Sequence, residues 1–492
     1  MNTTRRARTA AYFALAFLQT QSLCPLGAAP PMATSSSQDT DAPRYRLREV
    51  PLPMGARGAT ATAIAGNGDT AGVADVVERP VIRPVGPPAP GLGRGGANSY
   101  SYFDRDAPYV HRDTLNVLVL AYLLFNWHLV RDFYRRPIDD DETGSRGPSG
   151  AGKRVRVMTR QAFTATNEGK SRLVSGNSNG NKTPEGFPAL AVASGINTRG
   201  VVVGLVPSAL DENRSRAFVW TNEGKEPNRG RDLGTFGGPG SAAWGINEAG
   251  RIVGDAQMDG GVLRAFAVDL PSTNEPLRLH DLGTLGGSQS RARAINNAGR
   301  VVGSAETTDY ETRACVWETG ASTLALSPAV PLSVPARTLS SEAVAVASDG
   351  TAAGRVEVTK GHFVPAVWSA GGECTVLPTL SDGQQAEATG VAIVNGTVIV
   401  VGMSDIAPPK ETAPAKEDTL PPVPPLPERR PFLWHGGRLY DLSRLVSAPG
   451  WTLLGVSAIN DRGEIAGWGR YKKRVQSFVL YLETNSNQTA SK

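Results

Sequence analysis

Cysteine and histidine are scarce in this chain, and so are the patterns that mark most catalytic and metal sites. Its 492 residues include three cysteines and five histidines. The cysteines Cys24, Cys315 and Cys374 lack the spacing of a disulfide framework, and we expect the last two to be small, buried residues. No histidine has a second metal-ligating residue at a suitable spacing. The sequence therefore predicts no catalytic residue, no cofactor and no metal site.

An excess of one charge and long apolar runs are also lacking. The net charge is +5, without a basic stripe interleaved with aromatics, so no nucleic-acid partner is predicted. The one helix-like segment is 114–134, and its apolar core, Leu115–Val130, has 16 residues. A membrane span needs about 20. We expect a helix packed on the protein or on a partner, with membrane contact through Leu115–Val130 as the alternative.

Glycine is abundant, with 55 residues, and it marks an internal repeat. Asp281–Gly303 (DLGTLGGSQSRARAINNAGRVVG) repeats Asp232–Gly254 (DLGTFGGPGSAAWGINEAGRIVG) at an offset of 49 residues. Apolar residues alternate with period two between Gly, Asn and Asp, which predicts short antiparallel strands and tight turns. Four strands fit one unit. A period of this length predicts an array of small β-units that share their cores.

The marker of a unit is an aliphatic residue followed by glycine at the fourth and eighth positions. A looser copy at Val391–Gly402 brings the number of units to seven. The six regular copies begin at Ile64, Ile196, Ile246, Ile295, Val346 and Ile459. A third strand also recurs, as in Arg216–Trp220 (RAFVW). Seven four-stranded units predict an all-β fold, a seven-bladed β-propeller.

Two intervals between markers are long, 132 residues after Ile64 and 68 residues after Val391. The first contains a third strand, because Gln161–Lys170 (QAFTATNEGK) matches Arg216–Lys225 (RAFVWTNEGK). Both intervals are therefore predicted to be insertions between the second and third strands of a blade. Their predicted bounds are 74–153, which contains the helix, and 404–430, which is rich in proline.

The two ends of the repeat region have complementary defects. Arg46–Gly55 aligns without gaps with Arg278–Gly287 and so resembles a fourth strand that has no blade of its own. The last unit ends at its third strand, near Leu482. We expect the N-terminal strand to complete the last blade, which would close the ring and leave no exposed sheet edge. An open β-solenoid is the alternative.

The DLGTLGG stretch, the Ile-Asn-x-x-Gly-x-Val-Val-Gly turn and the RAFVW strand together resemble the HAF-type repeat of bacterial extracellular proteins. The resemblance covers most of residues 44–482 and implies an extracellular β-propeller-like fold without an assigned activity. This chain differs from the family at the histidine for which the repeat is named. Arg216, Arg264, Arg313 and Gln161 stand at that position in this sequence. A ring of ligand-binding histidines therefore does not transfer to this chain.

The N-terminus has the pattern of a secretory signal peptide. Arg5, Arg6 and Arg8 precede an apolar run, Ala10–Leu18, and small residues follow. We therefore expect a protein of the bacterial envelope, either periplasmic or secreted to the extracellular space. The predicted organisation is a signal peptide at 1–29, a disordered linker at 30–43, the propeller at 44–482 and a disordered tail at 483–492.

Two recurring residue types are candidates for a site, and both have a structural interpretation. The asparagines of the repeated turn satisfy the local backbone, and the glycines three residues later allow positive φ. These turn positions are Asn197, Gly200, Asn247, Gly250, Asn296, Gly299, Asn460 and Gly463. The repeated tryptophans are predicted to pack between blades, with a sugar-binding ring as the alternative. They are Trp220, Trp317, Trp368 and Trp434.

These observations favour a secreted, non-enzymatic β-propeller that binds a protein or glycan ligand as a monomer. One alternative is a secreted hydrolase or lyase whose site is built from dispersed residues on several blades. A second is an envelope propeller anchored to the membrane through the 115–130 helix. An enzyme should bring two or more titratable residues with shifted pKa together at the mouth of the channel. A binding module should present polar or aromatic loops instead.

Overall fold

The computed structural model describes the propeller region and not the segments around it. The described residues are 42–77, 81–82, 154–155, 158–174, 191–206, 215–221, 229–270, 277–320, 324, 326–383, 385–406 and 428–483. The predicted signal peptide at 1–29 and the predicted helix at 114–134 lie outside them, as does most of the predicted linker and tail.

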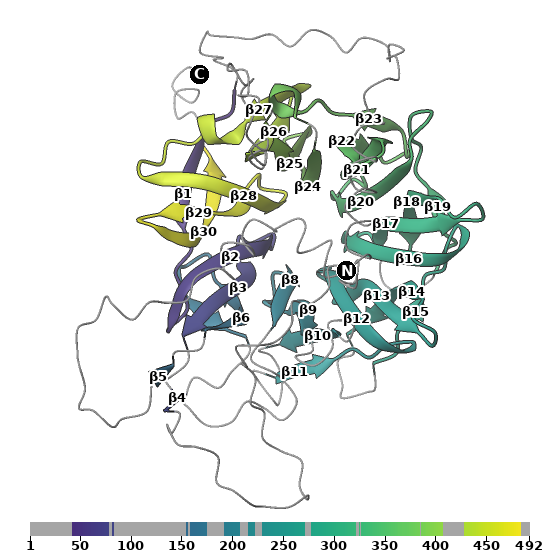
Figure 1. The fold of residues 1–492 in the computed structure, drawn as a ribbon, viewed down its shortest axis with the longest axis horizontal. Coiled ribbons are helices and arrows are strands. Elements are labelled where there is room, and N and C mark those ends of the chain that lie inside the picture. Colours follow the sequence, from purple (N-terminus) through teal and green to yellow (C-terminus); the bar gives the residue numbers. More distant parts are fainter. Residues whose placement is uncertain are drawn as a thin grey trace, which may run out of the picture. The chain divides into compact units, whose positions relative to one another are not determined.

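The described residues form seven four-stranded antiparallel sheets, here called blades I to VII (Figure 1). Blade I contains β2 (Ala56–Ile64), β3 (Thr70–Val77), β6 (Met158–Ala165) and β7 (Ser171–Leu173). Blade II contains β8 (Val192–Ile196), β9 (Val202–Val206), β10 (Arg216–Thr221) and β11 (Arg229–Asp232). Blade III contains β12 (Gly237–Ile246), β13 (Arg251–Met258), β14 (Leu263–Asp269) and β15 (His280–Asp281). Blade IV contains β16 (Gly286–Ile295), β17 (Arg300–Thr307), β18 (Thr312–Glu318) and β19 (Val330–Pro331).

Blade V contains β20 (Ser340–Val346), β21 (Ala352–Thr359), β22 (His362–Trp368) and β23 (Cys374–Val376). Blade VI contains β24 (Ala386–Val394), β25 (Thr397–Asp405), β26 (Arg429–His435) and β27 (Arg438–Asp441). Blade VII contains β28 (Trp451–Ile459), β29 (Ile465–Tyr471), β30 (Arg474–Leu482) and β1 (Tyr45–Glu49). Outside the blades, β4 (Val81–Ile82) pairs with β5 (Arg154–Val155), and η2 (Leu380–Asp382) and η3 (Leu442–Arg444) are single 3-10 turns.

The blades share their cores in pairs around a closed ring. Each of seven hydrophobic clusters combines buried residues of two neighbouring blades. The seventh joins the last blade to the first, because Val50 and Val479 pack with Ala59 and Phe163. No single blade buries a core alone, as the repeat pattern required. The predicted seven-bladed β-propeller is confirmed.

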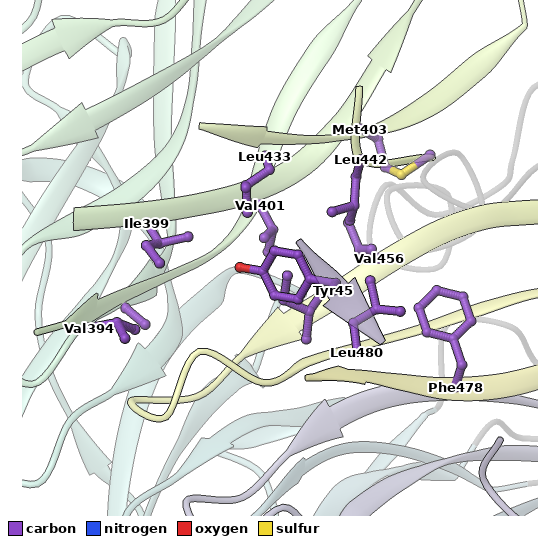
Figure 2. Packing of buried hydrophobic residues seen from close by; sticks show 12 residues of the cluster. Tyr45, Val394, Ile399, Val401, Met403, Leu433, Leu442, Val456, Phe478 and Leu480 are labelled. Carbon is purple, nitrogen blue, oxygen red and sulfur yellow. The ribbon is translucent and has the colours of Figure 1, made fainter. Parts of the chain in front are cut away.

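Strand β1 completes blade VII, as predicted from the ends of the repeat region. It pairs antiparallel with β30, with Tyr45 opposite Leu482 and Glu49 opposite Phe478. The Tyr45 side chain is 1% exposed and lies among Val401, Leu433 and other apolar residues of blades VI and VII (Figure 2). The N-terminal strand therefore covers the outer edge of β30 and helps to fill a core between two blades.

In five of the seven blades the second glycine of the repeat marker faces a phenylalanine of the third strand. Gly254 on β13 is paired with Phe266 on β14. A Cβ at this position would lie 2.0 Å from the backbone oxygen of Ala242 and 2.8 Å from the Phe266 ring. Only glycine fits there, because the aromatic ring lies directly over the backbone of the neighbouring strand. The glycine of the marker is thus a packing requirement.

The two ends of the blades differ. We call the end that carries the Asn-x-x-Gly turns between first and second strands the turn face, and the opposite end the loop face. β3 pairs with β6, and β25 pairs with β26, so both long intervals leave and re-enter their blades at the loop face. Strands extend into both predicted insertions, since 74–77 belong to β3, 404–405 to β25 and 429–430 to β26. These strands are longer than predicted because their pairing continues past the predicted boundary, for example between Val77 and Met158.

Candidate ligand site between blades III, IV and V

The asparagines predicted to be structural make two kinds of hydrogen bond at the turn face. Asn197 Oδ1 accepts from the backbone amides of Arg199 and Val201, within its own turn. Its Nδ2 donates to the backbone oxygen of Asn247 in the next blade, at 3.1 Å. The same hydrogen bond, from the asparagine side chain to a backbone oxygen of the next blade, recurs from Asn247 to Asn296, from Asn296 to Ala347 and from Asn460 to Ala65. The glycines Gly200, Gly250, Gly299 and Gly463 have φ of 72°, 90°, 88° and 76°.

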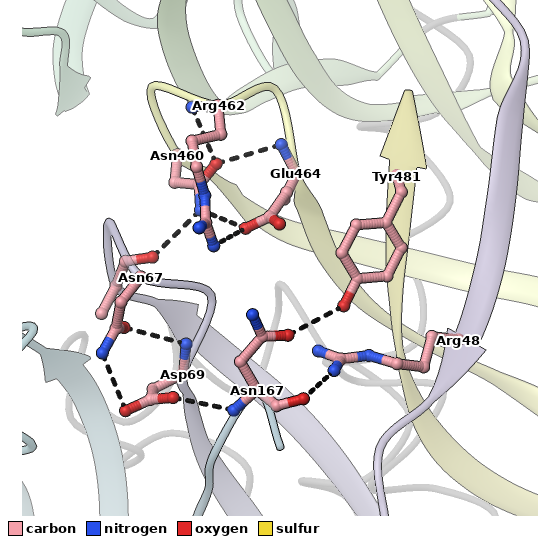
Figure 3. Close-up of polar contacts among 9 residues, drawn as sticks. Arg48, Asn67, Asp69, Asn167, Asn460, Arg462, Glu464 and Tyr481 are labelled. Atoms are coloured by element: carbon pink, nitrogen blue, oxygen red, sulfur yellow. Dashed lines mark hydrogen bonds and ion pairs between the residues drawn. The ribbon is translucent and has the colours of Figure 1, made fainter. Parts of the chain in front are cut away.

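These bonds also join blade VII to blade I. Asn460 is held by Glu464 and Arg462 on one side, and Asn67, Asp69 and Asn167 lie on the other (Figure 3). Asn67 Nδ2 donates to Asp69 Oδ2, and Asp69 Oδ1 accepts from the Asn167 amide at 2.8 Å. The turn residues therefore lock neighbouring blades together, which the sequence signalled only by their constant spacing.

The arginine that replaces the histidine of the repeat also has a partner within its blade. Arg216 forms an ion pair with Asp232 at 2.9 Å, and Arg264 forms one with Asp281 at 3.2 Å. In both cases the aspartate belongs to the DLG stretch. Asp281 Oδ1 also accepts from the Gly283 amide and so fixes the turn that follows. These residues connect the third and fourth strands and do not converge on a ligand.

The repeated tryptophans lie inside the protein. Trp220, Trp317 and Trp368 are at most 2% exposed, and Trp434 is half-buried. The first three belong to the clusters between neighbouring blades. Their rings are therefore not available as a sugar-binding surface.

The first strand of each blade contains a bulge, and in four blades the bulged residue carries a hydroxyl. Thr62 and Ser194 each donate to a backbone oxygen in the following blade, Ala193 and Ala243 respectively, at 2.6 Å. Ser457 does the same to Ala61 at 2.9 Å, across the joint between blades VII and I. The fourth hydroxyl is that of Thr389, at 3.3 Å from the Val456 oxygen.

Blades III, IV and V depart from this pattern. Their bulged residues are Trp244, Arg293 and Val344. Trp244 Nε1 donates to Asp255 Oδ2 at 2.6 Å, and the Arg293 guanidinium lies over the Trp244 ring at 4.9 Å. The hydroxyl of the bulge is thus replaced in three consecutive blades, by an aromatic residue in blade III, a charged one in blade IV and an aliphatic one in blade V.

A chain of ion pairs runs from this point through blade VI. Its three acidic members are buried: Glu342 and Glu387 each lie between two arginines, and Asp405 pairs with one. The pairs are Arg293–Glu342 at 2.7 Å, Arg355–Glu342 at 3.0 Å, Arg355–Glu387 at 3.4 Å, Arg429–Glu387 at 3.2 Å and Arg429–Asp405 at 3.0 Å. Buried charges are tolerated when they are paired in this way.

The pKa values of these groups follow from burial and from their neighbours. Burial raises the pKa of Glu342, but Arg293, Arg355 and Arg291 outweigh it and lower that pKa to about 2. Burial raises the pKa of Asp255 against the charges of Arg291 and Arg293. Burial likewise lowers the pKa of Arg291. Titratable residues with shifted pKa thus do converge. Glu342 is fixed in ion pairs and Asp255 by a hydrogen bond from Trp244, whereas Arg291 has neither among the described residues.

A cavity of about 440 Å³ opens beside this cluster, at the loop-face ends of the first strands. Its walls come from three blades, through β13, β16, β17, β20 and β22 and the strands beside them. The lining is polar except for a few side chains, of which Phe363 is the aromatic one, and the Arg355 guanidinium lies over its ring at 4.7 Å. The lining includes Gln257, Arg291, Ser304, Thr312, Glu342 and Phe363. A volume of this size suits a small ligand or one or two sugar rings.

Three polar side chains in this cavity make no hydrogen bond among the described residues. Gln257 is buried, and its Oε1 has no donor. No carboxylate of the described ranges lies within ion-pair distance of Arg291, although Asp255 and Glu342 are near enough to influence its pKa. Ser304 is 5% exposed and lies directly opposite Arg291 on β17. None of these residues recurs in the repeat, so sequence reasoning did not find them.

No group of three or more metal-ligating side chains occurs within the described ranges. Over the same residues, none of the helical segments has the length and apolarity to span a bilayer. Cys315 is buried and Cys374 is half-buried, and both are free thiols.

No family model matches the chain, and no curated protein matches its sequence. Among solved structures, TolB from Acinetobacter baumannii is 14% identical at a TM-score of 0.28, covering 50% of this chain and 57% of that one. A puromycin hydrolase S511A mutant complexed with PGG is 13% identical at a TM-score of 0.39, covering 64% and 47%. This chain therefore spans about half the length of these two. The β-propeller domain of the Trilobed protease from Pyrococcus furiosus is 11% identical at a TM-score of 0.31, covering 60% and 99%. At such TM-scores these likenesses carry no argument about what this chain binds or catalyses.

Proposed function

We propose that this chain is a secreted, non-enzymatic binding module of the HAF-repeat type and that it holds its ligand in the cavity between blades III, IV and V. The observation that carries the proposal is that one cavity holds Gln257, whose Oε1 has no hydrogen-bond partner, together with Arg291 and Ser304, whose side chains make no hydrogen bond to any residue that the structure describes. Buried polar groups without partners are costly, and they are typical of sites that a ligand completes. The basic and apolar N-terminal segment, residues 1–29, supports secretion.

Binding is favoured over catalysis by the titratable residues that line the cavity. Glu342 is ionised at neutral pH because its pKa is lowered to about 2, and two arginines hold its carboxylate. Arg291 is a cation at any physiological pH. Neither group transfers protons readily near pH 7, as a hydrolase or lyase would require. Asp255, whose pKa is raised, is fully buried and does not line the cavity.

The proposal is tested by capturing ligands with the mature protein from glycan panels and envelope extracts. A tryptophan at Thr312, an exposed residue of the cavity rim, should block the site without disturbing the core. We expect Thr312→Trp to weaken capture at least about tenfold. The matched control is Val376→Trp, on the exposed outer strand β23, which should bind normally.

Two results would overturn this function. One is a captured ligand whose affinity is the same for Thr312→Trp and for the natural protein. The other is recovery of a chemically altered ligand after incubation, which mass spectrometry would detect and which would support the hydrolase or lyase alternative. Fractionation of cells, with and without residues 112–136, tests secretion against anchoring to the membrane.

A further inference from the structure

The strongest clue to the ligand is a difference between two equivalent positions in blades IV and V. In blade V, Glu342 on the first strand lies opposite Arg355 on the second, and their side chains form an ion pair at 3.0 Å. In blade IV the corresponding residues are Arg291 and Ser304. The basic partner is present in both blades, but in blade IV the carboxylate is missing.

The surroundings of Arg291 do not supply that carboxylate. Its guanidinium has five N–H donors in a planar fork, and none of them has an acceptor among the described residues. Of the neighbouring acids, Glu342 is bound by Arg293 and Arg355, and the fully buried Asp255 accepts from Trp244 through Oδ2. Asp255 Oδ1 has no hydrogen-bond partner among the described residues, and Asp255 forms no ion pair with Arg291 there. A planar guanidinium that is largely buried and unpaired is suited to a bidentate bond with a carboxylate from outside the protein.

The rest of the cavity favours a hydroxyl-rich molecule. The Gln257 side-chain amide lacks a hydrogen-bond partner among the described residues and can accept from a hydroxyl. Ser290 Oγ and Ser341 Oγ accept from the backbone amides of Ala265 and Ala314, which leaves their own hydroxyl hydrogens to donate. Phe363 adds an apolar surface for the face of a sugar ring. A carboxylate, several hydroxyls and an apolar ring face occur together in a uronic acid.

We propose that the cavity binds an acidic carbohydrate, with Arg291 holding a uronic-acid carboxylate and Gln257 accepting from a neighbouring sugar hydroxyl. This inference rests on the proposed binding function and narrows it to one class of ligand. Ser304 lies where a protein carboxylate would otherwise compete with the ligand for Arg291.

The experiment is a titration of the mature full-length protein with tri-galacturonate and with its fully methyl-esterified form, followed by calorimetry at fixed salt. Esterification removes the charge and keeps the sugar rings. We expect the acid to bind and the ester to bind at least about tenfold more weakly, as for the loss of one charge-assisted bidentate contact. Arg291→Ala places an alanine where blade III has Ala242 at the equivalent position. This variant should bind the acid and the ester equally weakly. Arg291→Lys should recover part of the difference, because it restores the charge without the fork.

A second variant places a carboxylate of the protein itself beside Arg291. Ser304→Glu should pair with Arg291, abolish binding of the acid and leave the protein folded, as blade V does with Glu342 and Arg355. The inference is overturned if the acid and its ester bind alike, if Arg291→Ala binds the acid normally, or if the acid does not bind. If a neutral ligand is captured instead and Thr312→Trp blocks it, the inference fails and the binding function stands. If no ligand of any class depends on Thr312, both fail.

Discussion

At the scale of single residues, Arg291 and Glu342 show that two charged residues of one cluster can have opposite effects on stability. Arg291 is surrounded by Arg293 and Arg355 as well as by acids, and it makes no hydrogen bond within the described part of the chain. Glu342 makes two ion pairs in the same region. The first residue should be costly in the protein without ligand, and the second should be necessary for its stability.

We therefore expect Arg291→Ala to stabilise the protein without ligand. Removing a desolvated group that has no partner should raise the free energy of unfolding by about 1 kcal/mol. Urea unfolding of both proteins measures this change. Arg216→Ala, which removes an exposed arginine with an ion-pair partner, is the control and should have little effect. A clear loss of stability in Arg291→Ala would show that Arg291 has a structural partner.

Glu342→Gln should destabilise the protein in a way that depends on pH. The pKa of Glu342 is lowered from 4.5 to about 2, so its contribution is present above the unfolded-state pKa and is lost as pH falls through the folded-state value. At pH 7 the substitution leaves Arg293 and Arg355 without their shared carboxylate, at a cost of about 3 kcal/mol. Urea unfolding at pH 7 and near pH 2 should show this difference shrinking toward zero. Glu318→Gln, at an exposed ion pair with Arg300, should have almost no effect at either pH, and a pH-independent loss in Glu342→Gln would contradict the assignment.

The sequence predicted the residues that every blade needs and missed those that one blade uses. Gly254 and Asn247 recur because each blade has the same close backbone approach and the same joint to its neighbour. Arg291 and Ser304 occupy positions that vary between blades, with glutamate at the first position in blades V and VI, so no repeat signal marks them. Their significance depends on the ladder register, which shows that Arg291 faces Ser304 where blade V has a matched pair.

At the scale of elements, β1 shows which features of a strand can be predicted in advance. Its alignment with the DLG stretch predicted the pairing with β30, because the fourth strand of a blade is defined by its neighbours. The burial of Tyr45, the first residue of β1, was not predicted. Tyr45 is buried between blades VI and VII, and burial raises the pKa of its hydroxyl, which has no hydrogen-bond partner among the described residues.

Two substitutions at Tyr45 separate its ring from its hydroxyl. Tyr45→Phe should leave the free energy of unfolding unchanged or raise it by up to about 1 kcal/mol, because a buried polar atom without a partner is removed. Tyr45→Ala should lower it by about 3–5 kcal/mol, because the ring fills the core shown in Figure 2. Urea unfolding of the three proteins provides the test. Equal losses in both variants would mean that the hydroxyl is bonded after all.

At the scale of the whole propeller, closure depends on a strand that is distant in sequence from its partner and adjacent in space. The Glu483 amide donates to the Arg44 oxygen at 2.8 Å, beside the pair of Tyr45 and Leu482. The end of β30 and the start of β1 are therefore placed like the two sides of a hairpin. The ring should tolerate a direct connection at this point, because a two-residue turn such as Asn-Gly spans adjacent antiparallel strands.

We therefore expect a circular permutant to fold as the natural protein does. In it, residues 53–483 are followed by Asn-Gly and then by residues 44–52, so that β1 follows β30 directly. Its free energy of unfolding should lie within about 1 kcal/mol of the natural order, since the same contacts form and one long loop closure is replaced by a short one. A protein that simply begins at residue 53 exposes the edge of β30 and loses Tyr45 from its core, so it should self-associate or unfold. Light scattering and urea unfolding distinguish these outcomes, and a truncated protein that stays monomeric and fully stable would show that the ring does not depend on its N-terminal strand.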